Sequence, residues 1–124
     1  MNIKYLIGFF LVSSIASAAE QVPTVPAQFI GEWHAKLSDC GSDKDDSKLV
    51  ISPQSVRYYE STGPIKAIVS NGEDEIAIIV QLSGEGETWL AADDFKLSAD
   101  GAKLESDAQA GDSLTRYRCP KHLK

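Results

Sequence analysis

Apolar residues alternate with polar or small ones along most of this chain, which is the period of strands that bury one face. No segment sustains the 3.6-residue period of a helix. The turn signals between the apolar stretches are strong, and Asn71-Gly72 is the strongest because both residues tolerate positive φ. The pattern predicts eight short strands, at residues 29–37, 49–51, 56–60, 65–70, 76–82, 89–97, 102–105 and 113–119.

These strands predict an all-β domain over residues 29–120. A small domain of this kind manages its sheet edges best by closing, so we expect a small antiparallel β-barrel of about eight short strands, with a β-sandwich as the alternative. Residues 19–28 contain two prolines and predict an extended leader, and residues 121–124 a tail. Asp93 interrupts the apolar face of residues 89–97, which predicts a bulge near Asp93-Asp94.

The first 18 residues have the layout of a cleaved secretory signal. One cation, Lys4, precedes an apolar run from Tyr5 through Val12, and Ala16-Ser17-Ala18 supplies the small residues of a cleavage site. The run is too short to span a bilayer. No cysteine lies near the cleavage site, so we expect no lipid anchor and no membrane contact after cleavage. The sequence thus predicts a periplasmic or secreted protein.

The exported domain is acidic. The chain has 12 basic and 18 acidic residues, and removal of Lys4 with the signal changes the formal net charge from −6 to −7. Such a charge repels phosphate backbones and anionic membranes and favours cationic partners. We therefore expect no nucleic-acid binding. Roughly 105 residues remain, enough for a single core and a monomer.

Two cysteines in an exported domain predict one disulfide, Cys40–Cys119. In an eight-stranded up-and-down barrel, the first and last strands end at opposite rims. The two Cα atoms of a disulfide must nevertheless come within about 7 Å. Three alternatives remain open: the Cys40 loop folds back along the barrel wall, the strand count is odd, or the thiols are free.

Gly31-Glu32-Trp33 and the arginines Arg116 and Arg118 resemble the two ends of the lipocalin-like barrels, the calycins. That family carries Gly-x-Trp on its first strand and an arginine near the end of its last. The resemblance implies that a guanidinium stacks across the indole of Trp33 and closes one barrel end, which is a favourable cation–π contact. It also implies a carrier of a small apolar ligand.

Four segments are similar to a group of uncharacterised exported proteobacterial proteins. This resemblance spans most of the domain and implies no activity. The segments are Tyr58-Tyr59-Glu60-Ser61, residues 83–89, residues 97–101 and Arg116-Tyr117-Arg118-Cys119-Pro120.

Catalytic and metal motifs are lacking, so we expect no enzyme activity, no cofactor and no metal. His34 is interpreted as an exposed strand residue and His122 as part of the tail. The pairs Glu85/Glu87 and Asp93/Asp94 are interpreted as solvated acids rather than a glycosidase dyad. An EF-hand counted from Asp43 puts Lys48 at the glycine position and Gln54 at the glutamate position, so that motif fails.

The function that these observations favour is binding of a protein partner through loops at one barrel end, as an inhibitor or an immunity-type protein does. A cationic partner fits the charge. The candidate contact loops carry Asp43, Asp45, Asp46, Thr62, Glu85 and Glu87. The alternative is a carrier whose cavity is lined by Tyr58, Tyr59 and Trp89 and holds a small apolar ligand.

Overall fold

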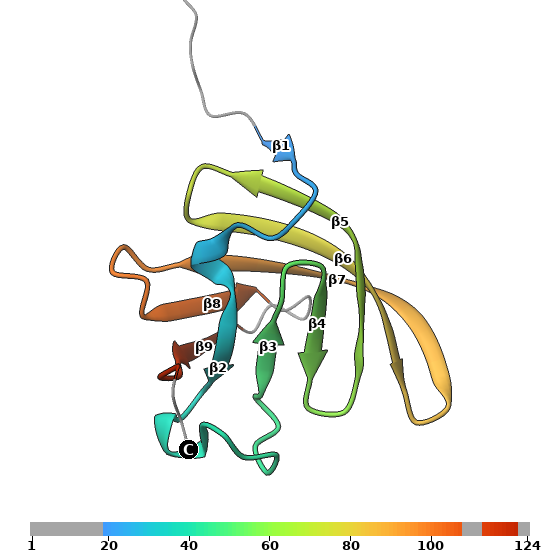
Figure 1. Cartoon of the computed structure of the whole chain (residues 1–124), viewed down its shortest axis with the longest axis vertical. Helices are drawn as coiled ribbons and strands as arrows, with labels where there is room; N and C mark the ends of the chain where they lie inside the picture. Colours follow the sequence, from blue (N-terminus) through green and yellow to red (C-terminus); the bar gives the residue numbers. More distant parts are fainter. Residues whose placement is uncertain (1–18, 108–112, 122–124) are drawn as a thin grey trace, which may run out of the picture.

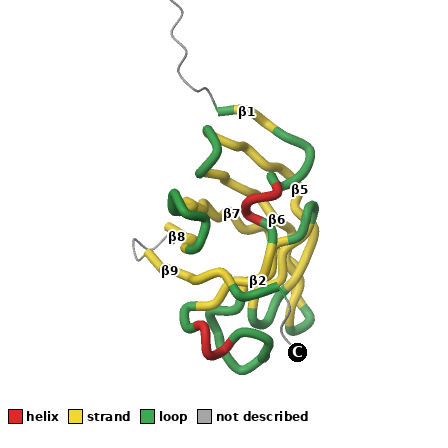
Figure 2. Tube along the Cα trace, turned by 60° about the vertical axis from the view of Figure 1, so that its left-hand side comes forward, coloured by secondary structure: helices red, strands yellow, loops and turns green. Residues whose placement is uncertain are grey.

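The alternating sequence folds into β-strands joined by tight turns in the computed structural model, which describes residues 19–107 and 113–121. Within these residues, helix is confined to two single turns (red in Figure 2). The predicted signal segment lies outside the described residues. In chain order the elements are β1 (Glu20–Gln21), η1 (Ala27–Phe29), β2 (Gly31–His34), η2 (Leu37–Asp39), β3 (Leu49–Ile51), β4 (Ser55–Tyr58), β5 (Thr62–Asn71), β6 (Glu75–Gly84), β7 (Glu87–Leu97), β8 (Lys103–Asp107) and β9 (Ser113–Arg118).

Strands β2 to β9 form a closed antiparallel barrel (Figure 1). Each pairs with the next along the chain, and the last returns to the first through Trp33↔Arg118 and His34↔Tyr117. Closure confirms the predicted eight-stranded barrel and removes the sandwich alternative. β1 lies outside the barrel, where the leader pairs with β5 through Glu20↔Ser70 and Gln21↔Val69.

The inward residues of the alternating pattern make the core, as the sequence predicts. On β6 and β7, for example, Ile76 pairs with Phe95, and both are almost fully buried. Full burial of one such side chain stabilises the fold by about 1.5–3 kcal/mol. The largest fully buried side chains are Trp33, Phe29, Phe95, Leu49, Ile51, Leu104, His34, Val56 and Val80.

Two local predictions are wrong. The first barrel strand is only Gly31–His34, because Phe29 belongs to η1 and the chain turns into η2 after Lys36. No bulge occurs at Asp93: β6 and β7 pair in continuous register along their length, and Asp93 lies opposite Ile78 on the inward face. The polar side chain is accommodated there by a hydrogen bond rather than by a break in the strand. The register shift lies between Ile65 and Ala67 of β5.

One end of the barrel is capped by Arg118. Its guanidinium carbon lies 4.3 Å from the centroid of the Trp33 ring, and the same group donates hydrogen bonds to the backbone carbonyls of Gly101, Ile30 and Gln28. Gly31 adopts φ +147°, and a Cβ there would come within 3.1 Å of the guanidinium. Glycine thus makes room for the arginine. We call this end the capped rim.

The Cys40–Cys119 disulfide is confirmed, with Cα atoms 5.7 Å apart. The segment after β2 folds back along the outside of the barrel wall, where the Gly41 amide donates to a Glu32 carboxylate oxygen at 3.0 Å. Cys119 lies beside the same residue, because its amide donates to the Glu32 carbonyl. Of the three alternatives, the loop that folds back is the one found, and the strand count stays even.

Candidate functional site

The end of the barrel opposite the capped rim gathers the predicted contact loops. Among the described residues, the up-and-down order places three connections there: residues 35–48 between β2 and β3, residues 59–61 between β4 and β5, and residues 85–86 between β6 and β7 (Figure 1). We call this end the loop rim. The long β6–β7 hairpin extends beyond the neighbouring strands and forms one side of it.

A hollow of about 340 Å³ opens at the loop rim between the last two of these connections. The pairing Thr62↔Ser83 brings the two turns side by side. The two turns approach so closely that a Cβ atom at Gly84 would come within 2.4 Å of the Glu60 carbonyl oxygen. We call this hollow the acidic pocket; it is lined by Glu60, Ser61, Gly84, Glu85, Glu87 and Trp89.

The pocket combines negative charge with an aromatic surface. Glu60, Glu85 and Glu87 are exposed, and no ion pair neutralises them within residues 19–107 and 113–121. Trp89 lies opposite Leu82 on the inward face of the hairpin, yet it is 42% exposed. Carboxylates beside an open indole can bind a cation through ion pairing and a cation–π contact.

The tip of the β6–β7 hairpin carries an unusual backbone conformation. Glu85 and Gly86 form a two-residue turn between the paired residues Gly84 and Glu87, and both have positive φ, 50° and 81°. Turns of this kind prefer asparagine, aspartate or glycine at the first position. Glu85 is the one non-glycine residue with positive φ in the described part of the chain.

Three of the four other predicted contact residues have structural partners. Asp43 pairs with Lys48 at 2.6 Å, and Asp45 hydrogen-bonds His34 at 2.8 Å. Asp46 is exposed on the same loop. The Thr62 hydroxyl donates to the Val56 carbonyl at 3.1 Å. The structure therefore brings Glu85 and Glu87 together in the pocket and places Asp43, Asp45 and Asp46 elsewhere on the loop rim.

The three residues predicted to line a cavity point to different places. Trp89 lines the acidic pocket, and Tyr59 is 42% exposed. Tyr58 donates from its hydroxyl to Asp93 at 2.8 Å in the barrel interior, and burial together with the Asp93 charge raises the pKa of Tyr58. The Tyr58–Asp93 hydrogen bond thus lies in the barrel interior, which is where a carrier protein would bind an apolar ligand.

Arg116 extends this interior network. It is almost fully buried and donates hydrogen bonds to the Ser47 carbonyl at 2.6 Å and the Ser106 hydroxyl at 2.8 Å. Burial raises the pKa of Asp93, which corrects its interpretation as a solvated acid, and burial lowers the pKa of Arg116. Arg118, not Arg116, lies over Trp33, so the two arginines predicted at the barrel end have different positions.

A second polar cluster lies under the loop that folds back from β2. His34 is fully buried, which corrects its interpretation as an exposed residue; its Nε2 lies 2.7 Å from Glu32 and its Nδ1 2.8 Å from Asp45. Burial opposes ionisation of Asp45, but hydrogen bonds from Ser47 and His34 outweigh it and lower its pKa to about 2. Burial likewise opposes ionisation of Glu32, whose pKa is lowered by the Gly41 amide and by His34.

A further hollow of about 340 Å³ lies at the end of strands β5, β6 and β7 that carries Asn71, Glu75 and Lys96. It contains a cation among its acids, since Lys96 lies 3.9 Å from a Glu75 carboxylate oxygen. Its negative charge is therefore partly compensated, unlike that of the acidic pocket. Its lining residues are Ala19, Val69, Asn71, Glu75, Ile76, Ala77, Asp94, Phe95, Lys96, Glu105 and Asp107.

Comparison of the chain with protein-family models, curated proteins and solved structures found no match. Among the described residues, no helix has the length and apolar character needed to cross a membrane. The geometry of the loop rim is therefore the main basis for a functional conclusion.

Proposed function

We propose that this protein is an exported, non-enzymatic binding protein that holds a cationic protein partner at the loop rim. The observation that carries the proposal is the acidic pocket, where Glu60, Glu85 and Glu87 surround the exposed Trp89. A lysine or arginine side chain of the partner would lie against the indole with its charge among the carboxylates. Inhibitors and immunity-type proteins bind in this way, through loops on a rigid scaffold.

Three further features support the proposal. The signal-like layout of residues 1–18 favours export, and the Cys40–Cys119 disulfide is consistent with an oxidising compartment outside the cytoplasm. The calycin-like ends would supply a rigid barrel. The interior hydrogen bond between Tyr58 and Asp93 makes the alternative, a carrier of an apolar ligand, the weaker proposal.

The experiment compares two variants with equal net charge. The pocket variant is Glu60→Gln/Glu85→Gln/Glu87→Gln, and the control variant removes three exposed charges elsewhere: Glu20→Gln/Glu73→Gln/Glu105→Gln. Each is immobilised in the oxidised form, and partners are captured from periplasmic and secreted extracts. We expect a cationic partner that binds the wild type and the control variant and binds the pocket variant about 10- to 100-fold more weakly.

Equal loss of binding in both variants would show that overall acidity, rather than the pocket, attracts the partner. Unchanged binding in the pocket variant would overturn the proposal. Titration of Trp89 fluorescence with the captured partner adds a direct readout, because a cation seated on the indole should change its emission.

Replacement of Glu85 with asparagine should separate stability from binding. Asparagine tolerates positive φ better, so we expect Glu85→Asn to raise the free energy of unfolding by about 0.5–1 kcal/mol and to weaken partner binding. Urea unfolding and partner affinity measure the two effects. Glu87→Gln is the matched control, which loses a pocket charge at a position without positive φ and should gain no stability. Equal stability of Glu85→Asn and the wild type would show that the turn carries no strain.

A further inference from the structure

We propose that reduction of the Cys40–Cys119 disulfide creates a Zn²⁺ site in which both cysteine thiolates, the His34 imidazole and the Glu32 carboxylate are the ligands. The site lies between the outer face of β2 and the loop that folds back over it. It is separate from the acidic pocket and does not depend on the proposed partner.

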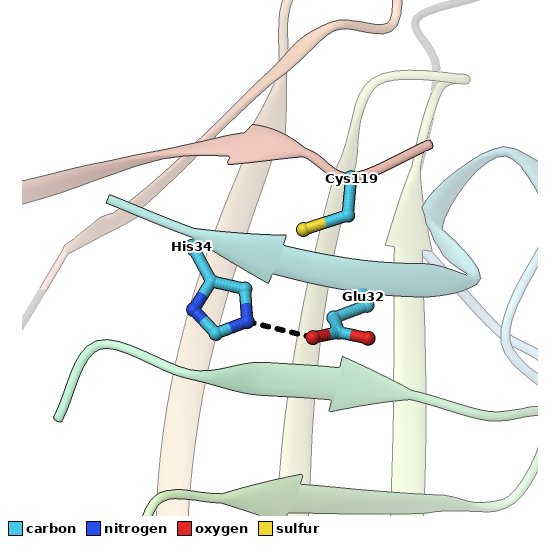
Figure 3. A group of neighbouring side chains, drawn as sticks. All are labelled: Glu32, His34 and Cys119. Atoms are coloured by element: carbon cyan, nitrogen blue, oxygen red, sulfur yellow. Dashed lines mark hydrogen bonds and ion pairs between the residues drawn. The ribbon is translucent and has the colours of Figure 1, made fainter. Parts of the chain in front are cut away.

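Three of the four groups are already gathered in the oxidised protein. One candidate ligand atom each from Glu32, His34 and Cys119 lies within 4.8 Å of the other two (Figure 3). The Cys40 sulfur is bonded to that of Cys119, at 1.96 Å. Neighbouring ligands around a tetrahedral zinc ion lie roughly 3.5 Å apart, given its bond lengths. The sulfur atoms must therefore separate, and the other two groups need only small movements.

His34 is oriented as zinc-binding histidines usually are. Its Nδ1 faces the Asp45 carboxylate at 2.8 Å, and its Nε2 faces the Glu32 carboxylate at 2.7 Å. With zinc on Nε2, the hydrogen on Nδ1 would be donated to Asp45, because a carboxylate can only accept. Nε2 is the nitrogen beside Glu32, and zinc would take the place of any hydrogen that it shares with that carboxylate. A carboxylate behind the histidine fixes its tautomer and ring orientation and strengthens it as a ligand. Asp45 is in turn held by the Ser47 amide at 3.0 Å.

Burial and charge also favour a bound divalent cation. His34 and Cys119 are almost fully buried, which makes this a closed site of the kind that structural zinc occupies. Glu32, Asp45 and the two thiolates would provide negative charge around the ion, and Lys48 is the nearby cation that acts on Glu32. Two sulfur ligands and one nitrogen favour zinc over calcium or magnesium, which prefer oxygen.

The redox step requires a dithiol reductant. The reductant transfers two electrons and two protons by thiol–disulfide exchange, which breaks the Cys40–Cys119 bond and forms the disulfide of the reductant. Zn²⁺ then binds the two cysteine sulfurs as thiolates, and their two protons, with any proton displaced from His34 Nε2, are released to water. The disulfide and the bound zinc ion are therefore alternative cross-links at the same position.

The test uses the chain from residue 19 in three forms: oxidised wild type, reduced wild type, and the variant Cys40→Ser/Cys119→Ser. The reduced wild type and the serine variant both lack the covalent cross-link. The loss of stability that follows from its absence is therefore the same in both forms. Zn²⁺ affinity is measured by competition with a chelator, and Co²⁺ serves as a spectroscopic probe. We expect one Zn²⁺ per reduced wild-type chain, bound at least about 100-fold more tightly than by either other form.

Two further readouts identify the ligands. Bound Co²⁺ should show the absorption of thiolate coordination in a tetrahedral site, and Zn²⁺ should raise the unfolding temperature of the reduced wild type alone. His34→Gln should weaken Zn²⁺ binding at least about tenfold. If His34→Gln does not fold, Asp45→Asn is used in its place and should weaken Zn²⁺ binding in the same direction. Equal Zn²⁺ affinity in the reduced wild type and the serine variant, or a Co²⁺ spectrum without thiolate absorption, would overturn the site.

Discussion

Replacement of Arg116 with methionine is expected to lower the free energy of unfolding by about 3–5 kcal/mol, because it leaves the half-buried Asp93 without its nearby positive charge. The variant also loses the hydrogen bonds that tie β9 to Ser47 and Ser106. Methionine keeps most of the side-chain volume, so a packing defect contributes little. Urea unfolding at neutral pH measures the loss.

The pH dependence separates the electrostatic part of this effect from packing. Burial raises the pKa of Asp93 above its ordinary value of 3.8, and Arg116 opposes that rise. The folded chain thus holds the Asp93 proton more tightly than the unfolded chain, so this contribution to stability is greatest below pH 3.8 and falls as the pH rises above it. Without Arg116 the fall is larger. Arg116→Met should therefore cost less at acid pH than at neutral pH.

A double variant provides the control. In Arg116→Met/Asp93→Asn the carboxylate is neutral as well, and the asparagine oxygen can still accept the Tyr58 hydroxyl. We expect the double variant to be more stable than the sum of the single losses predicts. Additive losses, or a loss in Arg116→Met that does not change with pH, would contradict an electrostatic role for the arginine.

Removal of the disulfide has the second large expected effect. The two cysteines are 79 residues apart, and the loop-closure entropy of a chain of that length corresponds to roughly 4 kcal/mol. We expect Cys40→Ser/Cys119→Ser to lose that much free energy of unfolding. Chemical denaturation in the presence of a chelator measures the loss without interference from zinc.

The reduced wild type under the same conditions is the matched control, because it keeps both sulfur atoms and lacks only the bond. It should lose nearly as much stability as the serine variant. A loss below about 1 kcal/mol in both would show that the folded loop holds its position through Glu32, His34 and Asp45 without the covalent link.

The sequence predicts those parts of this molecule that depend on local pattern. Alternation along residues 76–82 and 89–97 correctly identifies the inward faces of β6 and β7, and Asn71-Gly72 correctly marks the hairpin between β5 and β6. Two cysteines are sufficient to predict the disulfide. The position of Glu85 in a tight turn, with Glu87 at the start of the next strand, also follows from the glycines beside them.

The sequence does not predict contacts that depend on how distant segments cover one another. His34 has the period of an exposed strand residue and is buried because residues 35–48 fold back over β2. Asp93 resembles a break in an apolar strand, and the Tyr58 hydroxyl that hydrogen-bonds it lies 35 positions earlier. The available sequence signal was a single polar residue within an otherwise apolar strand face. Such a residue indicates a hydrogen-bonding partner inside the barrel rather than a bulge.

The position of the disulfide also changes what a single proteolytic cut can do. Cys40 and Cys119 enclose β3 to β9 within one covalent ring. A cut anywhere between them, including the exposed tip at Glu85-Gly86, opens that ring but leaves both pieces joined through sulfur. A nicked molecule would keep its mass under non-reducing conditions and separate into two fragments only when a reductant is added.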